Sequence, residues 1–136
     1  MFAASAALRV AYEATAYVVC WRGQAAVLRI GGRPPPLPWG ACGQAVFVTA
    51  CNPLGRLRPA ASNRRAERLL RVELARAGWR MLAGEGRANA GDWPTEASVL
   101  VFGMRRLGAA ALGRRWRQNA VVRIVRFGRI GVVPLR

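Results

Sequence analysis

The sequence predicts an α+β fold. We expect a ferredoxin-like split βαβ layer, an antiparallel sheet with two helices on one face, preceded by an N-terminal helix and hairpin. A hydrophobic fraction of 53% over 136 residues indicates a single folded domain, residues 1–136, with its own core. From residue 46 onward the pattern reads strand, helix, strand, strand, helix, strand, with one further strand at the end. A three-layer α/β sheet is the alternative, but it needs a crossover where residues 84–94 offer no helix.

The first part of the chain forms the expected extension. Apolar residues at helical spacing predict a short helix over residues 4–15. β-Branched and aromatic residues then predict a hairpin over residues 17–30 that turns near Gly23. Four prolines make residues 31–43 a connecting loop.

The central segment carries the clearest pattern. Residues 46–50 are a continuous apolar run, typical of a strand buried on both faces. Asn52 and Pro53 end this strand, because Pro lacks an N–H for the ladder and Asn favours a turn. Ser62 is then expected to cap a helix that stops at Gly78, the left-handed C-terminal residue. Its apolar stripe consists of Ala66, Leu70, Leu74 and Ala77.

The remaining elements complete the predicted layer. They are a strand at 79–83, a polar loop at 84–94, a strand at 97–102, a helix at 107–117 and a hairpin of strands at 121–125 and 130–133.

The charge is strongly positive. All 22 basic residues are Arg, against 6 acidic residues, so the formal net charge is +16. Arg binds phosphate bidentately and stacks on bases, which favours nucleic acid or an anionic small molecule as partner. A GC-rich genome also replaces Lys by Arg, but it does not explain the shortage of acids. Both interpretations stay open.

Several classes of site are excluded or disfavoured by what is missing. The chain has no His, which removes Ser-His and Cys-His catalytic pairs and the commonest metal ligand. We therefore expect neither a metal nor a cofactor. Cys20, Cys42 and Cys51 form no CxxC pair, and their odd number favours a reducing cytoplasm over a disulfide framework. No apolar run approaches the length of a membrane span, so a soluble, cytoplasmic protein without a membrane partner is expected.

Four amide side chains are candidate ligand-binding groups. Asn52 follows the first strand of the layer, Asn63 lies at the next helix start, and Gln118 and Asn119 precede a later strand. Each alone is explained by backbone capping or a turn. Together they suit recognition, because amides read donors and acceptors without titrating.

Glu96 is the one candidate for a catalytic acid or base. It stands close to Trp93, and a carboxylate beside an aromatic ring can have a raised pKa, although a partner Arg is the simpler role. Cys51 is expected to be a small packed residue, because no His is present to activate it.

Arginines near the helices are candidates for binding an anion. Arg64 and Arg65 would supply charge at the start of the first long helix. The densest basic and aromatic cluster is residues 114–117, in which Trp116 stands among three arginines. The simplest interpretation is an amphipathic helix with Trp116 turned inward, and the alternative is stacking on bases.

These motifs resemble a known bacterial family, catalogued as domain of unknown function 3293. The resemblance rests on Val-Thr-Ala-Cys-Asn-Pro at 48–53, Asn63, Trp-Pro-Thr-Glu-Ala-Ser at 93–98 and Gly-Arg-Arg-Trp-Arg-Gln-Asn-Ala-Val at 113–121. It covers residues 12–136 and implies no established activity. The chain departs from the family pattern at Cys51, where an aromatic is usual, at Ala66, and around Arg87, where the family often has a His.

Three functions are compatible with these observations. The first is a binding or interaction module for an anionic ligand that bears phosphate or is a nucleic acid. The second is an enzyme acting on a nucleotide-like substrate, with Glu96 as general acid or base. The third is a structural subunit of a ribonucleoprotein or phage-derived assembly.

Overall fold

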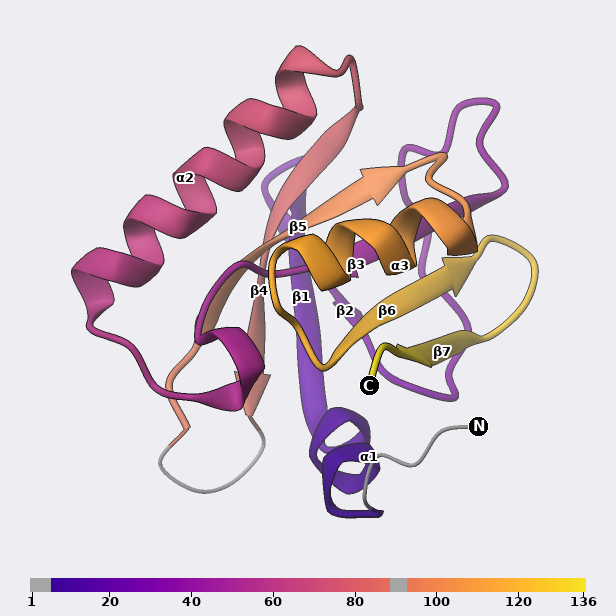
Figure 1. Cartoon of the computed structure of the whole chain (residues 1–136). Helices are drawn as coiled ribbons and strands as arrows, with labels where there is room; N and C mark the ends of the chain where they lie inside the picture. Colours follow the sequence, from indigo (N-terminus) through magenta and orange to yellow (C-terminus); the bar gives the residue numbers. More distant parts are fainter. Residues whose placement is uncertain (1–5, 89–92) are drawn as a thin grey trace.

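The computed structural model describes residues 6–88 and 93–136 and shows three α-helices, one short 3₁₀ helix and seven strands in this part of the chain (Figure 1). In order they are α1 (Ala6–Glu13), β1 (Thr15–Trp21), β2 (Gln24–Leu28), β3 (Gln44–Val48), η1 (Pro53–Gly55), α2 (Ala60–Arg76), β4 (Met81–Ala88), β5 (Glu96–Phe102), α3 (Arg106–Arg115), β6 (Ala120–Val125) and β7 (Ile130–Pro134).

The strands form one antiparallel sheet in the order β2-β1-β4-β5-β3-β6-β7. The predicted α+β class is confirmed, and so are the two hairpins, β1 with β2 and β6 with β7. The sheet is nevertheless larger than the predicted layer. The β1–β2 hairpin is no separate extension, because β1 pairs with β4 from Thr15↔Ala88 to Val19↔Gly84.

The predicted polar loop at 84–94 is wrong over its first part. Residues 84–88 continue β4, and Gly84 pairs with both Val19 of β1 and Ser98 of β5. Neighbouring strands on both sides impose an extended backbone on a stretch rich in Gly and charge, so pairing overrides the weak local preference. The rest of that prediction, residues 89–92, lies outside the described residues.

Both long helices pack on the same face of the sheet; Figure 1 shows α3 in front of the strands and α2 beside them at the upper left. Leu70 and Leu74 of α2 and Ala109 and Leu112 of α3 are buried in one apolar cluster with inward residues of the sheet. Trp116 packs against this cluster, which agrees with the inward position expected for it. Of the predicted α2 stripe, Leu70 and Leu74 lie in this half of the core and Ala66 packs against it, whereas Ala77 is exposed beyond the end of the helix.

The opposite face has a second apolar cluster. Phe47 and Leu100 of the central strands pack there with Leu37 and Trp39 from the proline-rich loop. The sheet curls around this cluster, and backbone hydrogen bonds join the loop after the edge strand β2 to the start of the opposite edge strand, β7. The Gly31 N–H donates to the Ile130 carbonyl (2.8 Å), and the Ile130 N–H donates to Gly32 (2.9 Å).

The ends of α2 differ in how well they were predicted. Gly78 has φ +84° and ends the helix as expected. The N-cap is Pro59, not Ser62, and no side chain caps this end. Pro59 is extended (ψ 145°), which lets the helix begin at Ala60 and places Ser62 inside its first turn. None of the described helices is long and apolar enough to cross a membrane.

Candidate functional site

A pocket of about 610 Å³ opens at the end of the sheet where β3 and β4 finish and β5 and β6 begin. It lies between α1, at the bottom of Figure 1, and the short η1 helix. Of the predicted site residues, the structure brings five to this pocket: Asn52, Trp93, Glu96, Gln118 and Asn119. Three of the four candidate amides thus lie at one pocket with Glu96, whereas Asn63, Arg64 and Arg65 do not line it.

The Glu96 carboxylate is held by two donors. Its Oε2 accepts hydrogen bonds from Asn52 Nδ2 (2.7 Å) and from Trp93 Nε1 (3.3 Å). Burial raises the pKa of Glu96 because the pocket disfavours the charged form, while these two hydrogen bonds act in the opposite direction. Glu96 forms no ion pair with any arginine in the described part of the chain, contrary to its simplest expected role.

The Asn52 side chain, which donates to Glu96, is itself held by a reciprocal pair of hydrogen bonds with Asn63. The Asn52 N–H donates to Asn63 Oδ1 and Asn63 Nδ2 donates to Asn52 Oδ1, both at 2.9 Å. Asn52 Oδ1 also accepts from the Arg58 N–H (2.9 Å). These contacts leave the Asn52 amide little capacity for a ligand. Asn63 lies behind the pocket wall as its support.

Gln118 and Asn119 keep free polar atoms at the pocket. Gln118 Nε2 donates to the carbonyls of Cys51 and Trp116, each at 3.2 Å, and its Oε1 has no partner within the described residues. The Asn119 side chain makes no hydrogen bond to any described residue, while its carbonyl accepts from Leu135 (3.0 Å). These two amides are therefore better placed to contact a ligand than Asn52 is.

The pocket wall has an unusual backbone. Two residues that line it, Asn52 and Leu54, have positive φ (46° and 59°). Arg117, which lies behind the wall, also has positive φ (57°), and its carbonyl accepts from the Leu54 N–H at 2.6 Å. A left-handed conformation costs a residue other than Gly about 1–2 kcal/mol. Such strain gathers at functional sites when surrounding contacts hold it in place, which supports the assignment of this region as a site.

The tyrosines of the N-terminal part were missed as pocket residues. Tyr12 of α1 donates from its hydroxyl to the Ala120 carbonyl (3.3 Å), and Tyr17 of β1 donates to the Tyr12 carbonyl (3.3 Å). Burial raises the pKa of both phenols, and the charge of Glu96 adds to this effect. The sequence carried no signal for this contact, because it depends on β1 pairing with β4.

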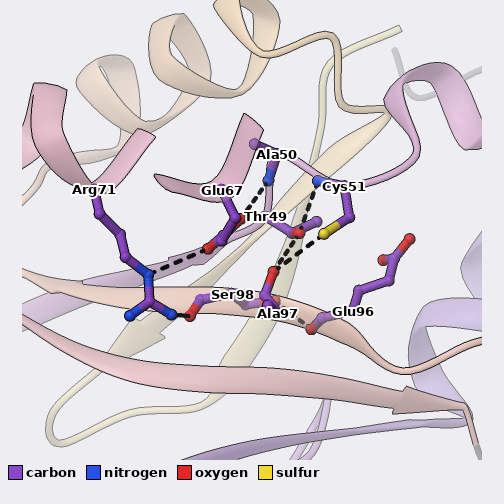
Figure 2. A network of polar contacts seen from close by, with 8 residues as sticks. All are labelled: Thr49, Ala50, Cys51, Glu67, Arg71, Glu96, Ala97 and Ser98. Atoms are coloured by element: carbon purple, nitrogen blue, oxygen red, sulfur yellow. Dashed lines mark hydrogen bonds and ion pairs between the residues drawn. The ribbon is translucent and has the colours of Figure 1, made fainter. Parts of the chain in front are cut away.

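The sequence analysis also did not single out Glu67, a residue of α2 whose carboxylate is buried on the side of the helix that faces the sheet (Figure 2). Its Oε2 accepts from the Ala50 N–H (3.1 Å), and its Oε1 lies 3.9 Å from Arg71 Nε. Burial raises the pKa of Glu67 to about 7. Helical spacing could have found it, because Glu67 precedes Leu70 by three residues and Leu74 by seven and so shares their face.

Cys51 is a packed thiol, as expected. It is buried, its Sγ lies 3.5 Å from the Ala97 carbonyl, and its N–H donates to Thr49 Oγ1 (3.0 Å) (Figure 2). Burial raises the pKa of Cys51, which disfavours the nucleophilic thiolate. Across residues 6–88 and 93–136, no three or more of His, Cys, Asp and Glu gather as they would around a metal ion.

The arginines predicted for the site lie elsewhere. Arg64 and Arg65 are exposed on α2 and do not line the pocket, because the first turn of α2 starts beyond the η1 segment. Arg58, Arg115 and Arg117 instead line a second, smaller cleft of about 290 Å³, which Asn63 also lines.

Comparisons with known proteins identify a family and nothing closer. Neither curated proteins nor solved structures give a match to this chain. A family model described as "Protein of unknown function (DUF3293)" matches residues 48–121, which is more than half of the chain. The matched segment contains Asn52, Glu96 and the Gln118-Asn119 pair, the residues that shape the pocket. This chain belongs to the DUF3293 family of proteins of unknown function.

Proposed function

We propose that this protein is a binding module for a small molecule, which it holds in the pocket between α1 and η1. The observation that carries the proposal is that one pocket of about 610 Å³ combines an apolar lining with the Glu96 carboxylate and two amides that retain free atoms. Binding sites are commonly concave, mostly apolar and equipped with a few convergent polar groups.

The free polar atoms favour a ligand with hydrogen-bond donors. Within the described residues, Glu96 Oε1 and Gln118 Oε1 have no hydrogen-bond partner, and both are acceptors. The Asn119 amide offers a donor and a further acceptor. A molecule with an apolar body and N–H or O–H groups, such as an amine or a nucleobase-like ring, fits this set.

The anionic ligand expected from the net charge stays a proposal, and this pocket does not favour it. No arginine stands among the described residues that line the pocket, and its charged group, Glu96, would repel an anion. The role as a structural subunit of a larger assembly stays a prediction.

The fold is compatible with a ligand-binding role. In the strand order β4-β5-β3-β6, β5 lies between the two strands that α2 connects, and α3 leads to an outer strand. We infer that these elements form a ferredoxin-like split βαβ unit, which β1, β2 and β7 extend. The pocket lies where this unit meets the added β1 and α1.

A fragment screen by nuclear magnetic resonance tests the binding proposal. A library of amines, amides and nucleosides is added to ¹⁵N-labelled protein, and the indole N–H of Trp93 at the pocket wall is the reporter. Ala11→Trp places a large ring at the α1 side of the pocket and is expected to abolish binding. Val10→Trp is the matched control, because Val10 is 63% exposed on the same helix and does not line the pocket. Equal binding by the two variants, or no hit on the wild type, contradicts the proposal.

An enzyme is the second candidate function, favoured by the raised pKa of the Glu96 carboxyl in a concave pocket. Glu96→Gln keeps an oxygen that can accept from Asn52 and Trp93 but cannot transfer a proton. Any activity found with a nucleoside or nucleotide substrate should therefore fall about 100-fold or more, with the melting temperature nearly unchanged. A large loss of stability would instead assign Glu96 to structure.

A further inference from the structure

A second hollow lies on the other side of the Asn52–Asn63 pair from the pocket. It is a cleft of about 290 Å³ between the start of α2 and the end of α3. Three arginines line it, Arg58, Arg115 and Arg117, together with Ser62 of α2 and the ring of Trp116. Residues far apart in the sequence thus contribute three arginines to the lining of one concave surface.

Two of the three arginine charges of this cleft are not neutralised by the described residues. The guanidinium groups of Arg58 and Arg117 have no acidic partner in that part of the chain. Arg115 pairs with Glu73 at 2.6 Å, which holds its guanidinium in place. Unpaired arginines that share a concavity repel one another, and an anion between them relieves this repulsion.

Further donors belong to the same region. The first turn of α2 has no side-chain cap, and the N–H groups of Ala61 and Ser62 have no hydrogen-bond partner within the described residues. The Trp116 Nε1 atom is buried and also lacks a partner among those residues. A buried donor without a partner is unfavourable, so its presence beside a cationic cleft is consistent with an acceptor that arrives with a ligand.

Arg117 has a strained backbone conformation at this position. Its φ of 57° is left-handed, and its carbonyl accepts from Leu54 (2.6 Å) on the segment that separates the two hollows. This contact ties the end of α3 to the η1 segment, and both Arg58 and Arg117 line the cleft.

We propose that this cleft binds a phosphate group, with Arg58 and Arg117 as the principal ligands and Arg115 and the start of α2 in support. Arg suits this role because its planar fork matches phosphate oxygens bidentately. The proposal does not depend on the pocket or on its ligand. The phosphate can belong to a small molecule or to the backbone of a nucleic acid, and the experiment separates these sources.

Calorimetric titration with pyrophosphate tests the site. The double variant Arg58→Gln, Arg117→Asn removes both principal ligands, and Asn tolerates the left-handed backbone at position 117. Arg64→Gln, Arg65→Gln is the matched control, because it removes two exposed charges of α2 that do not line the cleft. We expect the cleft variant to lose about tenfold or more in affinity and the control about twofold or less. Equal losses in both, or no binding by the wild type, overturn the proposal.

A second titration, with a single-stranded oligonucleotide, identifies the source of the phosphate. If the oligonucleotide binds more tightly than pyrophosphate, with a steep dependence on salt and with loss confined to the cleft variant, a nucleic-acid backbone is the ligand. If pyrophosphate binds more tightly, the ligand is a small phosphate. Equal weakening of oligonucleotide binding by both double variants indicates surface charge alone and contradicts a site.

The indole N–H signal of Trp116 provides a measurement that does not depend on the variants folding. Pyrophosphate added to the wild-type protein should shift this signal and leave that of Trp21, which lines neither hollow, unchanged. A titration in which Trp116 does not respond overturns the proposal even if a variant fails to fold.

Discussion

Replacing Glu67 by Gln should make the protein more stable at high pH and change it little in acid. Glu67 is 4% exposed, and its Oε1 atom is buried without a hydrogen bond in the described structure. Its pKa rises from 4.5 to about 7 on folding, mainly by burial. The folded state therefore binds more protons than the unfolded state between these values, so stability falls as the pH rises through this range.

The size of the effect follows from the shift. A shift of one pKa unit corresponds to about 1.4 kcal/mol, so a rise from 4.5 to about 7 destabilises the folded state by about 3 kcal/mol above pH 7. Part of this penalty is already present at pH 5. Between pH 5 and pH 8 the wild type should therefore lose about 2–3 kcal/mol relative to the variant. The Gln oxygen can still accept from the Ala50 N–H, so that hydrogen bond is retained.

The assay is urea unfolding of both proteins at pH 5 and pH 8. Taking the difference between variant and wild type at each pH cancels the titration of the groups that do not interact with Glu67. Glu13→Gln is the control for removing an exposed carboxylate, because Glu13 lies on the outer side of α1. A difference between Glu67→Gln and wild type that is the same at both pH values refutes the reasoning.

Two further substitutions test the packing and the site support. Gly113→Ala should destabilise the protein by about 1–3 kcal/mol, because a Cβ there would overlap Leu135 and lie 2.7 Å from Val121 Cγ1. In Gly108→Ala on the same helix, the new Cβ meets nothing closer than 3.5 Å, so this variant should instead be more stable by about 0.5–1 kcal/mol. Thermal unfolding of the two variants measures the difference, and equal changes in stability would contradict the packing argument. Asn63→Ala leaves the Asn52 N–H without its partner and should lower the free energy of unfolding by about 1–3 kcal/mol in urea, whereas Arg64→Ala should change it by less than about 0.5 kcal/mol. A loss no larger for Asn63→Ala than for Arg64→Ala would refute the supporting role of Asn63.

Local pattern was sufficient for most individual elements. The apolar run before Asn52, the inward position of Leu70 and Leu74 and the helix end at Gly78 agree with the structure, since each depends on neighbouring residues in the chain. Ala77, the last member of the predicted stripe, is exposed. The start of α2 was misplaced, because Ser62 is a good cap by type while Pro59 occupies the capping position. Residues 84–88 were misread as a loop, because their extended form comes from two partner strands and not from their own preference.

Some residues of the candidate site could be predicted from the sequence because they stand at the ends of strands. Asn52, Glu96 and the Gln118-Asn119 pair stand at strand ends, and strand ends of an antiparallel sheet can be placed from the order of the elements. Arg64 and Arg65 were assigned to the site from their nearness to Asn63 in the sequence. The helix turns them to the solvent instead.

The sequence by itself determined the α+β class, the charge and the absence of His, and it singled out five of the residues that line the pocket. These properties follow from composition and from contacts between near neighbours in the chain. Only the tertiary structure decided that β1 pairs with β4, that Tyr12 closes the pocket and that Arg58 and Arg117 share a cleft. The physical reason is that long-range pairing and burial depend on what the rest of the chain offers, and no local pattern records that partner.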